Sequence, residues 1–136
     1  MTGAGAGHAD DPPTNSRRAL GIEGERRAAD YLARRGYRII DRNVRCGGVE
    51  VDLIVGRGPL VVFVEVKARR SQRFGPPHGA VDEAKQARLM RAASAWLGSH
   101  PGRARRVRFD VVSCLAPQDG STSWRIEHLE GAFDGS

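Results

Sequence analysis

The chain of 136 residues has a net charge of +6 and a sequence pI near 10.3, with 40% hydrophobic and 28% charged residues. This balance fits one globular domain and argues against a wholly disordered chain. There is no apolar run near the roughly 20 residues of a membrane helix, no signal-peptide pattern, and only two widely separated cysteines. We therefore expect a cytoplasmic protein with no membrane partner, no disulfide framework and no cysteine zinc site.

Hydrophobic periodicity predicts a helix, three strands, a second helix and two more strands in chain order. The first helix, residues 17–35, is followed by Gly36, which suits a helix C-terminus. The second helix, residues 81–97, has apolar side chains at helical spacing. The expected strands are residues 37–45, 49–55, 60–66, 107–115 and 124–129.

This order of elements predicts an α/β fold with one mixed central sheet flanked by helices. Residues 1–16 lack apolar periodicity and are expected to form a flexible tail. Residues 134–136 are expected to form a short C-terminal tail, which leaves residues 17–133 as a single domain.

The hairpin between residues 49 and 67 combines strongly apolar strands with charged side chains. In its first strand, period-two alternation places Glu50 and Asp52 on one face. In its second strand, Glu65 and Lys67 share a face with Phe63. The apolar face of the first strand is expected to carry Val49, Val51, Leu53 and Val55.

We expect the turn of this hairpin to centre on residues 57–58. With that register, Glu50 lies opposite Glu65 and Asp52 lies opposite Phe63, so that Asp52 is diagonal to Glu65 at about 7–8 Å between backbones. Two carboxylates that converge from this distance can share one divalent cation, and hard cations such as Mg²⁺ prefer oxygen ligands. The alternative is a salt-bridged sheet face, in which Glu50 and Glu65 are merely half-exposed and Lys67 neutralises one of them.

The position of these charges favours a functional site, because packing alone would prefer Val or Ile on so apolar an element. A bound cation stabilises a pentavalent phosphate and lowers the pKa of an attacking water. A lysine such as Lys67 can orient that water or stabilise the negative charge that develops.

The order Asp52, then Glu65-Val66-Lys67, matches the D…(D/E)-x-K pattern of restriction-endonuclease-like nucleases. A longer ordered set of motifs resembles the YraN-like family of small bacterial proteins and covers residues 20–133. This set comprises Gly21-x-x-Gly24-Glu25, Gly36-Tyr37, Arg42-Asn43, Glu50-Val51-Asp52-Leu53-Ile54, Val62-Phe63-Val64-Glu65-Val66-Lys67, Arg108-Phe109-Asp110-Val111-Val112 and Ala132-Phe133.

The resemblance implies a restriction-endonuclease-like core in which Asp52 and Glu65 ligate Mg²⁺ or Mn²⁺ and Lys67 is the catalytic lysine. Related junction-resolving nucleases add a glutamate from the first helix, at the position that Glu25 occupies here. Glu25 and Glu50 are then expected to surround the metal ligands and to assist catalysis without binding the metal directly. The alternative for Glu25 is a solvated or capping residue of the helix.

Basic residues are concentrated in two blocks, with net charges of +5 in residues 17–45 and +8 in residues 68–108. They flank residues 46–67, whose net charge is −1, and this arrangement suits a protein that grips phosphates around an acidic pocket. Solvated helix faces in an arginine-rich chain are the alternative. The candidates for phosphate contacts are Arg69, Arg70, Arg73, Lys85, Arg103, Arg105 and Arg106.

Only Lys67 and Lys85 of the 22 basic residues are lysines. A lysine is a compact donor whose proton can be tuned, in contrast to the permanently charged arginine. Lys85 is therefore a candidate to reach the acidic site or a phosphate. Its alternative is an exposed helix lysine that pairs with Asp82.

Taken together, these patterns predict a cytoplasmic, metal-dependent nuclease-like domain that acts on DNA, with structured or branched DNA as the candidate substrate. A homodimer is compatible with cleavage of two strands. Two alternatives stay open at this point. One is a non-catalytic nucleic-acid-binding module that keeps the nuclease fold, and the other is an adaptor whose basic faces meet acidic proteins.

Overall fold

The computed structural model describes residues 13–70, 82–103, 106–117 and 123–133. The predicted order of helices and strands is confirmed, and the fold is α/β. The elements are α2 (Pro13–Arg34), β1 (Arg38–Cys46), β2 (Val49–Arg57), β3 (Leu60–Arg69), α3 (Glu83–Ser99), β4 (Arg106–Leu115) and β5 (Arg125–Leu129).

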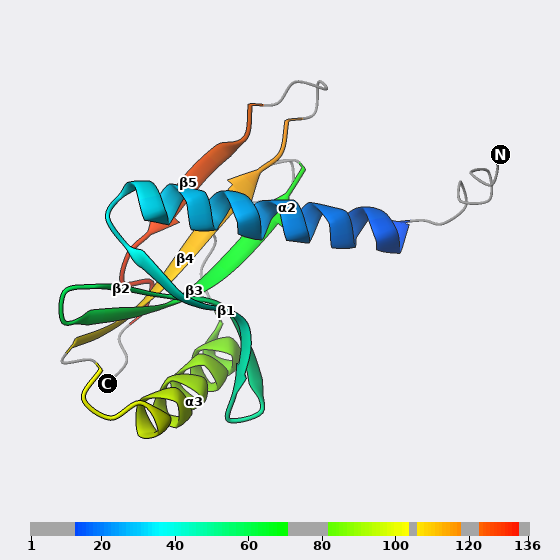
Figure 1. The fold of residues 1–136 in the computed structure, drawn as a ribbon. Coiled ribbons are helices and arrows are strands. Elements are labelled where there is room, and N and C mark those ends of the chain that lie inside the picture. The colour runs from blue at the N-terminus through cyan, green and yellow to red at the C-terminus, as the bar shows by residue number, and fades with distance from the viewer. Residues whose placement is uncertain (1–12, 71–81, 104–105, 118–122, 134–136) are drawn as a thin grey trace, which may run out of the picture.

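The five strands form one mixed sheet in the order β1-β2-β3-β4-β5. Three neighbouring pairs are antiparallel, whereas β3 and β4 run parallel. A parallel pair needs a crossover connection, and α3 lies within the one that joins β3 to β4 (Figure 1). The mixed sheet predicted from the sequence is therefore confirmed.

The two helices pack on opposite faces of this sheet. Leu32 of α2 belongs to one hydrophobic cluster together with Val62 of β3. Trp96 of α3 belongs to the other cluster, where its ring lies 5.9 Å from the ring of Phe63 in an edge-to-face arrangement. The central strand β3 is therefore buried on both faces, as its nearly unbroken apolar sequence predicts.

Helix α2 approaches β3 very closely at Gly24. A Cβ atom at this position would lie 2.6 Å from the Cβ atom of Ala68. Glycine therefore permits the contact, and it brings Glu25 to the C-terminal half of β3. Of the helices in the described ranges, none combines the length and the apolarity that a membrane crossing requires.

Some predicted boundaries shift. Helix α2 already begins at Pro13, so residues 13–16 of the predicted tail are helical. Strand β3 continues to Arg69 rather than ending at residue 66. The other predicted tail residues, 1–12 and 134–136, lie outside the described part of the chain.

The prediction that one face of β2 carries all its alternate valines and Leu53 is wrong. Val51 packs in the cluster on the α3 side, whereas Leu53 packs in the cluster on the α2 side. The change of face occurs at Asp52, just beyond the end of the β2–β3 ladder at Leu53 and Val64. On β1, Asn43 has a φ of +48°, a left-handed backbone that asparagine tolerates better than most residues.

The predicted register of the hairpin is also wrong. The turn is Gly58-Pro59, and Arg57 pairs with Leu60, so that Ile54 rather than Asp52 lies opposite Phe63. The last pair of this ladder is Leu53 with Val64. Extended by one position, the same register sets Asp52 directly across from Glu65.

Candidate active site

Asp52 is held by the backbone of the neighbouring strand. The Val66 N–H donates a hydrogen bond of 2.8 Å to Asp52 Oδ2. A continued ladder would pair Val66 with Val51, but the ladder stops at Leu53 and Val64. Where β2 and β3 separate, the Asp52 carboxylate therefore accepts the hydrogen bond that the Val66 N–H would otherwise donate to the backbone of β2. This bond fixes the position of the carboxylate.

Glu65 is held from the opposite side by α3. Its carboxylate Oε2 lies 3.2 Å from Lys85 Nζ, and its side chain is 15% exposed. Asp82 caps α3 by accepting a hydrogen bond of 2.8 Å from the Lys85 backbone N–H. Lys85 thus pairs with Asp82 only through its backbone, while its ammonium group reaches the acidic site.

Glu25 reaches the same region from α2. The Asn43 side chain of β1 interacts with the Glu25 carboxyl. Burial raises the pKa of Glu25, the Asn43 side chain opposes this shift, and the charges of Glu50 and Glu65 raise it further. Glu25 is therefore a half-buried member of the acidic group and not a solvated helix residue.

The electrostatics of Asp52 reflect this crowding. Burial raises the pKa of Asp52 to about 7, and the Val66 N–H counteracts part of the shift. The charges of Glu65 and Glu25 raise it further, whereas Lys85 lowers it. Three carboxyl groups and one ammonium group thus share a partly dehydrated region, where an additional cation would be stabilised.

Lys67 and Glu50 lie at the margin of this site. Lys67 lies two residues after Glu65 on β3, and its side chain is half-buried. Within the described residues, Lys67 has neither an ion pair nor a side-chain hydrogen bond, so its ammonium group is available. Glu50 is exposed on β2 and close enough to Glu25 to raise the pKa of that residue.

The side chains present fit a hard cation better than a closed metal site. In the described ranges, no group of three or more His, Cys, Asp or Glu side chains is arranged to hold a metal. Asp52 and Glu65 offer two carboxylates, which is the usual protein share of a Mg²⁺ site completed by waters and a substrate phosphate. Cys46 and Cys114 are both buried free thiols, and each has a pKa raised by burial, so neither suits a soft-metal thiolate site.

The structure separates the predicted phosphate-binding residues into two groups. Arg69 and Arg70 follow Lys67 at the C-terminal end of β3. Arg106 lies at the other end of the sheet, where it pairs with Leu60, about 16 Å along β3 from Glu65. Arg103 is exposed just beyond α3, whereas Arg73 and Arg105 lie outside the described residues.

Sequence reasoning missed two contributors to this site, the Asn43 side chain and the Val66 N–H. An asparagine within a predicted strand is a signal for a left-handed residue, because asparagine is enriched at positive φ. The Val66 N–H carries no signal in the sequence, since every non-proline residue has one.

The family described as "Uncharacterised protein family UPF0102" matches residues 24–114. A UPF0102 protein from Beutenbergia cavernae is 46% identical over 113 residues, which cover 83% of this chain and 94% of that protein. A UPF0102 protein from Anaeromyxobacter dehalogenans is 44% identical over 135 residues, which cover 99% of this chain and 95% of that protein. The chain therefore belongs to the UPF0102 family, in agreement with the YraN-like resemblance of its motifs.

Proposed function

We propose that this protein is a metal-dependent nuclease domain that binds DNA and hydrolyses its phosphodiester bonds. The observation that carries the proposal is the hydrogen bond of 2.8 Å from the Val66 N–H to Asp52, beside the strand position of Glu65. It fixes one carboxylate next to another at the open end of a strand pair, where a phosphate can approach. The adjoining Lys67 supplies an available ammonium group at the same end.

In this proposal, Asp52 and Glu65 would hold Mg²⁺ or Mn²⁺. When bound, such a cation neutralises phosphate charge and lowers the pKa of a coordinated water. Lys67 orients the attacking water and stabilises the negative charge that develops on the phosphate. Lys85 is a positioning residue, because its ion pair holds the Glu65 carboxylate in place.

The charge distribution supports a nucleic-acid substrate. Arg69 and Arg70 extend the site along β3, and their guanidinium groups suit the phosphates of a backbone that enters at that end. We propose structured or branched DNA as the substrate, a cytoplasmic location, and a homodimer when both strands are cut. Nucleic-acid binding of this kind would depend strongly on salt concentration.

A non-catalytic nucleic-acid-binding module is the second candidate. The ion pair of Lys85 with Glu65 favours it, since the ammonium group already neutralises part of the acidic charge that a cation would use. The two candidates share the fold and the basic surface, and they differ only in turnover.

A cleavage assay separates them. Labelled duplex, single-stranded, flap and four-way-junction DNA are incubated with the purified protein and Mg²⁺, Mn²⁺ or EDTA. Asp52→Asn and Lys67→Ala are compared with Asp30→Asn, a matched control at an exposed acid of α2 whose ion-pair partner among the described residues is Arg26. For the nuclease we expect metal-dependent products that both site variants lose by at least a hundredfold and the control retains.

Mn²⁺ binding by calorimetry provides the second readout. The nuclease proposal expects binding that Asp52→Asn abolishes and Asp30→Asn retains. Salt-sensitive DNA binding with no product on any of the four substrates favours the non-catalytic module. If DNA does not bind at all, both candidates are overturned and the adaptor interpretation remains.

A further inference from the structure

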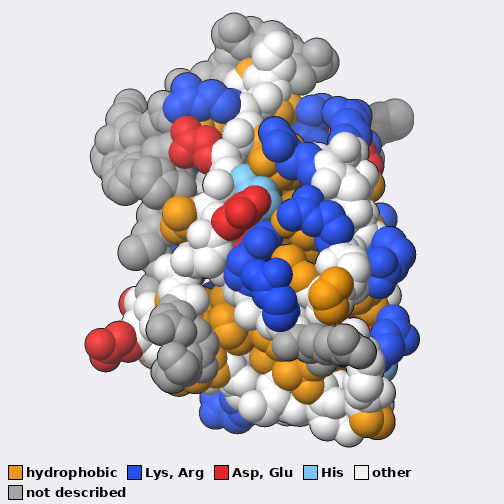
Figure 2. Space-filling view, turned by 90° about the vertical axis from the view of Figure 1, so that its left-hand side faces the viewer, with side chains coloured by type: hydrophobic (Ala, Val, Ile, Leu, Met, Phe, Trp, Pro, Cys, Tyr) orange, Lys and Arg blue, Asp and Glu red, His pale blue; other side chains and the backbone are white. Residues whose placement is uncertain are grey.

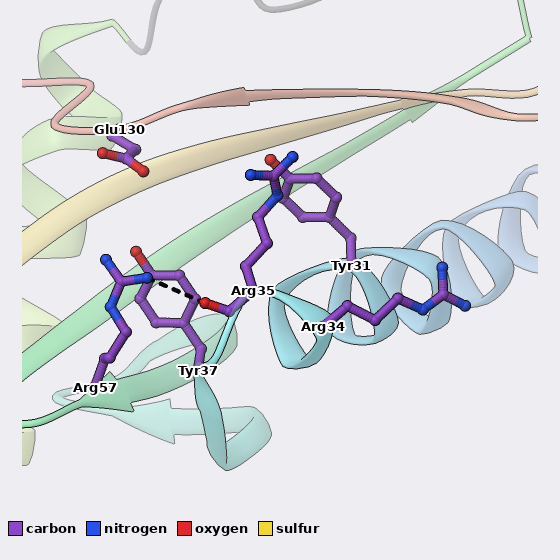
Figure 3. A pocket seen from close by; sticks show the side chains of 6 residues that line it. All are labelled: Tyr31, Arg34, Arg35, Tyr37, Arg57 and Glu130. Atoms are coloured by element: carbon purple, nitrogen blue, oxygen red, sulfur yellow. Dashed lines mark hydrogen bonds between the residues drawn. The ribbon is translucent and has the colours of Figure 1, made fainter.

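A second region rich in arginine lies at the C-terminal end of α2. Figure 2 faces the end of the molecule where α2 stops and β2 turns into β3, and Lys and Arg side chains gather there around exposed hydrophobic surface. A pocket of about 580 Å³ opens in this region. It is lined by Tyr31, Arg34, Arg35, Tyr37, Arg57 and Glu130 (Figure 3).

This pocket is distinct from the acidic site. Glu25 and Arg35 are ten residues apart along α2 and its end, a distance of about 15 Å at the rise of an α-helix. Arg57 stands next to the Gly58-Pro59 turn, at the end of the sheet opposite Lys67. None of the residues that line the pocket belongs to the proposed nuclease site.

The tyrosine rings of the pocket are each covered by a guanidinium group. Arg35 lies 4.6 Å from the ring centroid of Tyr31, and Arg57 lies 4.2 Å from that of Tyr37. Arg57 Nη1 also donates a hydrogen bond of 3.1 Å to the backbone oxygen of Arg35, drawn as the dashed line in Figure 3. The wall of the pocket thus presents flat, cationic groups held in fixed planes.

A buried network fixes the tyrosines from behind. Arg108 Nη2 donates a hydrogen bond of 2.7 Å to the Tyr37 hydroxyl, and its Nε and Nη2 atoms each lie 2.9 Å from the Asp110 carboxylate. His128 Nε2 lies 2.7 Å from Asp110 Oδ2, and His128 Nδ1 lies 3.3 Å from the Tyr31 hydroxyl. The Asp110 side chain is fully buried, so the hydrogen bonds of this network fix the two tyrosine side chains before any ligand binds.

The charges of the pocket suit an anion together with a hydrogen-bond donor. Within the described residues, neither Arg34 nor Arg35 forms an ion pair. The Arg35 guanidinium covers the Tyr31 ring, so Arg34 is the guanidinium group available to a phosphate. Glu130 is 56% exposed on the rim, 3.8 Å from Arg108 Nη1. As an acceptor-only group, its carboxylate matches the N–H donors on the edge of a nucleobase.

We propose that this pocket binds a nucleotide, with its phosphate on Arg34 and its base stacked against the guanidinium planes that cover Tyr31 and Tyr37. Guanidinium planes and aromatic rings are the groups on which unpaired bases stack in nucleic-acid-binding proteins. The volume also exceeds what a phosphate alone would need and falls in the range of small-molecule sites. The Tyr31 hydroxyl lies 3.3 Å from His128 Nδ1, and this contact helps to hold the ring under Arg35.

This proposal does not depend on the proposed nuclease activity, because binding is measured without cleavage. The same chemistry has two sources, a free mononucleotide and an unpaired nucleotide of single-stranded DNA. The probes are therefore dGMP, dTMP, inorganic phosphate, a single-stranded decamer and the corresponding duplex, titrated by calorimetry in EDTA.

We expect Arg35→Ala to weaken mononucleotide binding by about tenfold or more, the loss typical of one stacking contact. Arg35→Lys keeps the charge and removes the planar group, so it should also weaken binding. Arg18→Ala, an exposed arginine about 25 Å away on the same helix, is the matched control and should bind as the wild type does. Asp52→Asn should also bind normally, which separates this pocket from the nuclease site.

The contrary results are equally definite. The proposal is overturned if Arg35→Ala binds nucleotides as tightly as the wild type, or if inorganic phosphate competes as well as dGMP does. A decamer that binds tenfold more tightly than dGMP identifies single-stranded DNA as the source, and the reverse order identifies the free nucleotide. A preference of dGMP over dTMP that Glu130→Gln removes would assign base recognition to Glu130.

Discussion

Asp52 carries its negative charge in surroundings that disfavour it. The carboxylate is largely removed from water and lies close to the charges of Glu65 and Glu25, which together raise its pKa to about 7. Its hydrogen bond from the Val66 N–H recovers only part of this cost. Carboxyl groups with a strongly raised pKa are typical of functional sites, where the chemistry needs the ionised group.

Asp52→Asn should therefore stabilise the metal-free protein. The pKa of Asp52 is raised from 3.8 to about 7 in the folded state, so wild-type stability falls as pH rises through this interval. The asparagine oxygen still accepts from Val66, and no charge is buried. We expect the free energy of unfolding, measured with urea, to rise by about 1–3 kcal/mol at pH 8 and to stay unchanged at pH 3.5.

Asp30→Asn is the control for that experiment, because the Asp30 side chain is exposed and its ion pair with Arg26 lies on the surface of the helix. It should change stability by less than about 0.5 kcal/mol at either pH. A loss of stability in Asp52→Asn at pH 8 would mean that the carboxylate is a structural anchor, which would count against its proposed role.

Asp110 has the opposite behaviour. Burial alone would raise its pKa, but hydrogen bonds from His128, Arg108 and the Gly131 N–H outweigh burial and hold the pKa below 3.8. The stability that Asp110 contributes is therefore present above about pH 4 and is lost as pH falls further. An amide at this position would turn an N–H₂ group toward donors.

Asp110→Asn should cost about 3–5 kcal/mol at pH 7, the loss expected when one partner of a buried ion pair is removed. The variant should also be less acid-sensitive below pH 4 than the wild type, because it lacks the Asp110 carboxyl that becomes protonated there. Chemical denaturation between pH 2.5 and 7 measures both effects. Glu83→Gln, in the first turn of α3, is an acidic control that should leave the pH profile unchanged.

At the scale of elements, the contact between α2 and β3 depends on a missing side chain. Gly24→Ala would place a Cβ atom 2.6 Å from the Cβ atom of Ala68, so the helix must move. We expect a loss of about 1–3 kcal/mol in the free energy of unfolding, typical of an overpacked core. The double variant Gly24→Ala with Ala68→Gly should recover most of that loss.

Gly21→Ala provides the matched control on the same helix. A Cβ atom at Gly21 meets nothing within 4 Å. Alanine in place of a helix-interior glycine should therefore stabilise the protein by about 0.5–1 kcal/mol. Equal effects of the two single variants would contradict the close approach of α2 to β3.

The strands were predictable because their apolar residues recur with the period of a strand, and β3 was recognisable from its unbroken apolar run. The change of face at Asp52 was not predictable, since the apolar residues on either side of it keep the alternation of a regular strand in the sequence. The register of the β2–β3 hairpin could not be predicted from the hydrophobic pattern either. A turn at Gly58-Pro59 and a turn centred on residues 57–58 preserve the same alternation but pair different residues. Motif spacing therefore indicated which acids belong together, but not how they meet.

At the scale of the whole molecule, basic side chains of the described residues lie at both ends of the sheet, with Arg69 and Arg70 at one end and Arg57 and Arg106 at the other. Arg70 is exposed at the end that carries the acidic site. If it contacts one phosphate, Arg70→Ala should lower the slope of log K against log salt for DNA binding by about 1. Fluorescence anisotropy between 50 and 300 mM salt (approximately the range in which such contacts respond) measures this slope.

Arg106→Ala is the matched arginine control for the salt titration, since Arg106 is exposed and pairs with Leu60 at the opposite end of the sheet. Its slope should equal that of the wild type. Equal slopes in the wild type and Arg70→Ala would place the DNA elsewhere on the surface.

Because Glu25 and Arg35 are fixed to a single helix and the residue that ends it, the acidic site and the nucleotide pocket stand at a constant separation of about 15 Å. A stacked DNA strand advances about 3.4 Å per nucleotide, so roughly four nucleotides span that interval. If one DNA strand occupies both sites, the length of α2 sets the distance between the bound base and the cut. Sequencing gels should then show a cut about four nucleotides from the unpaired base, whatever the sequence between them.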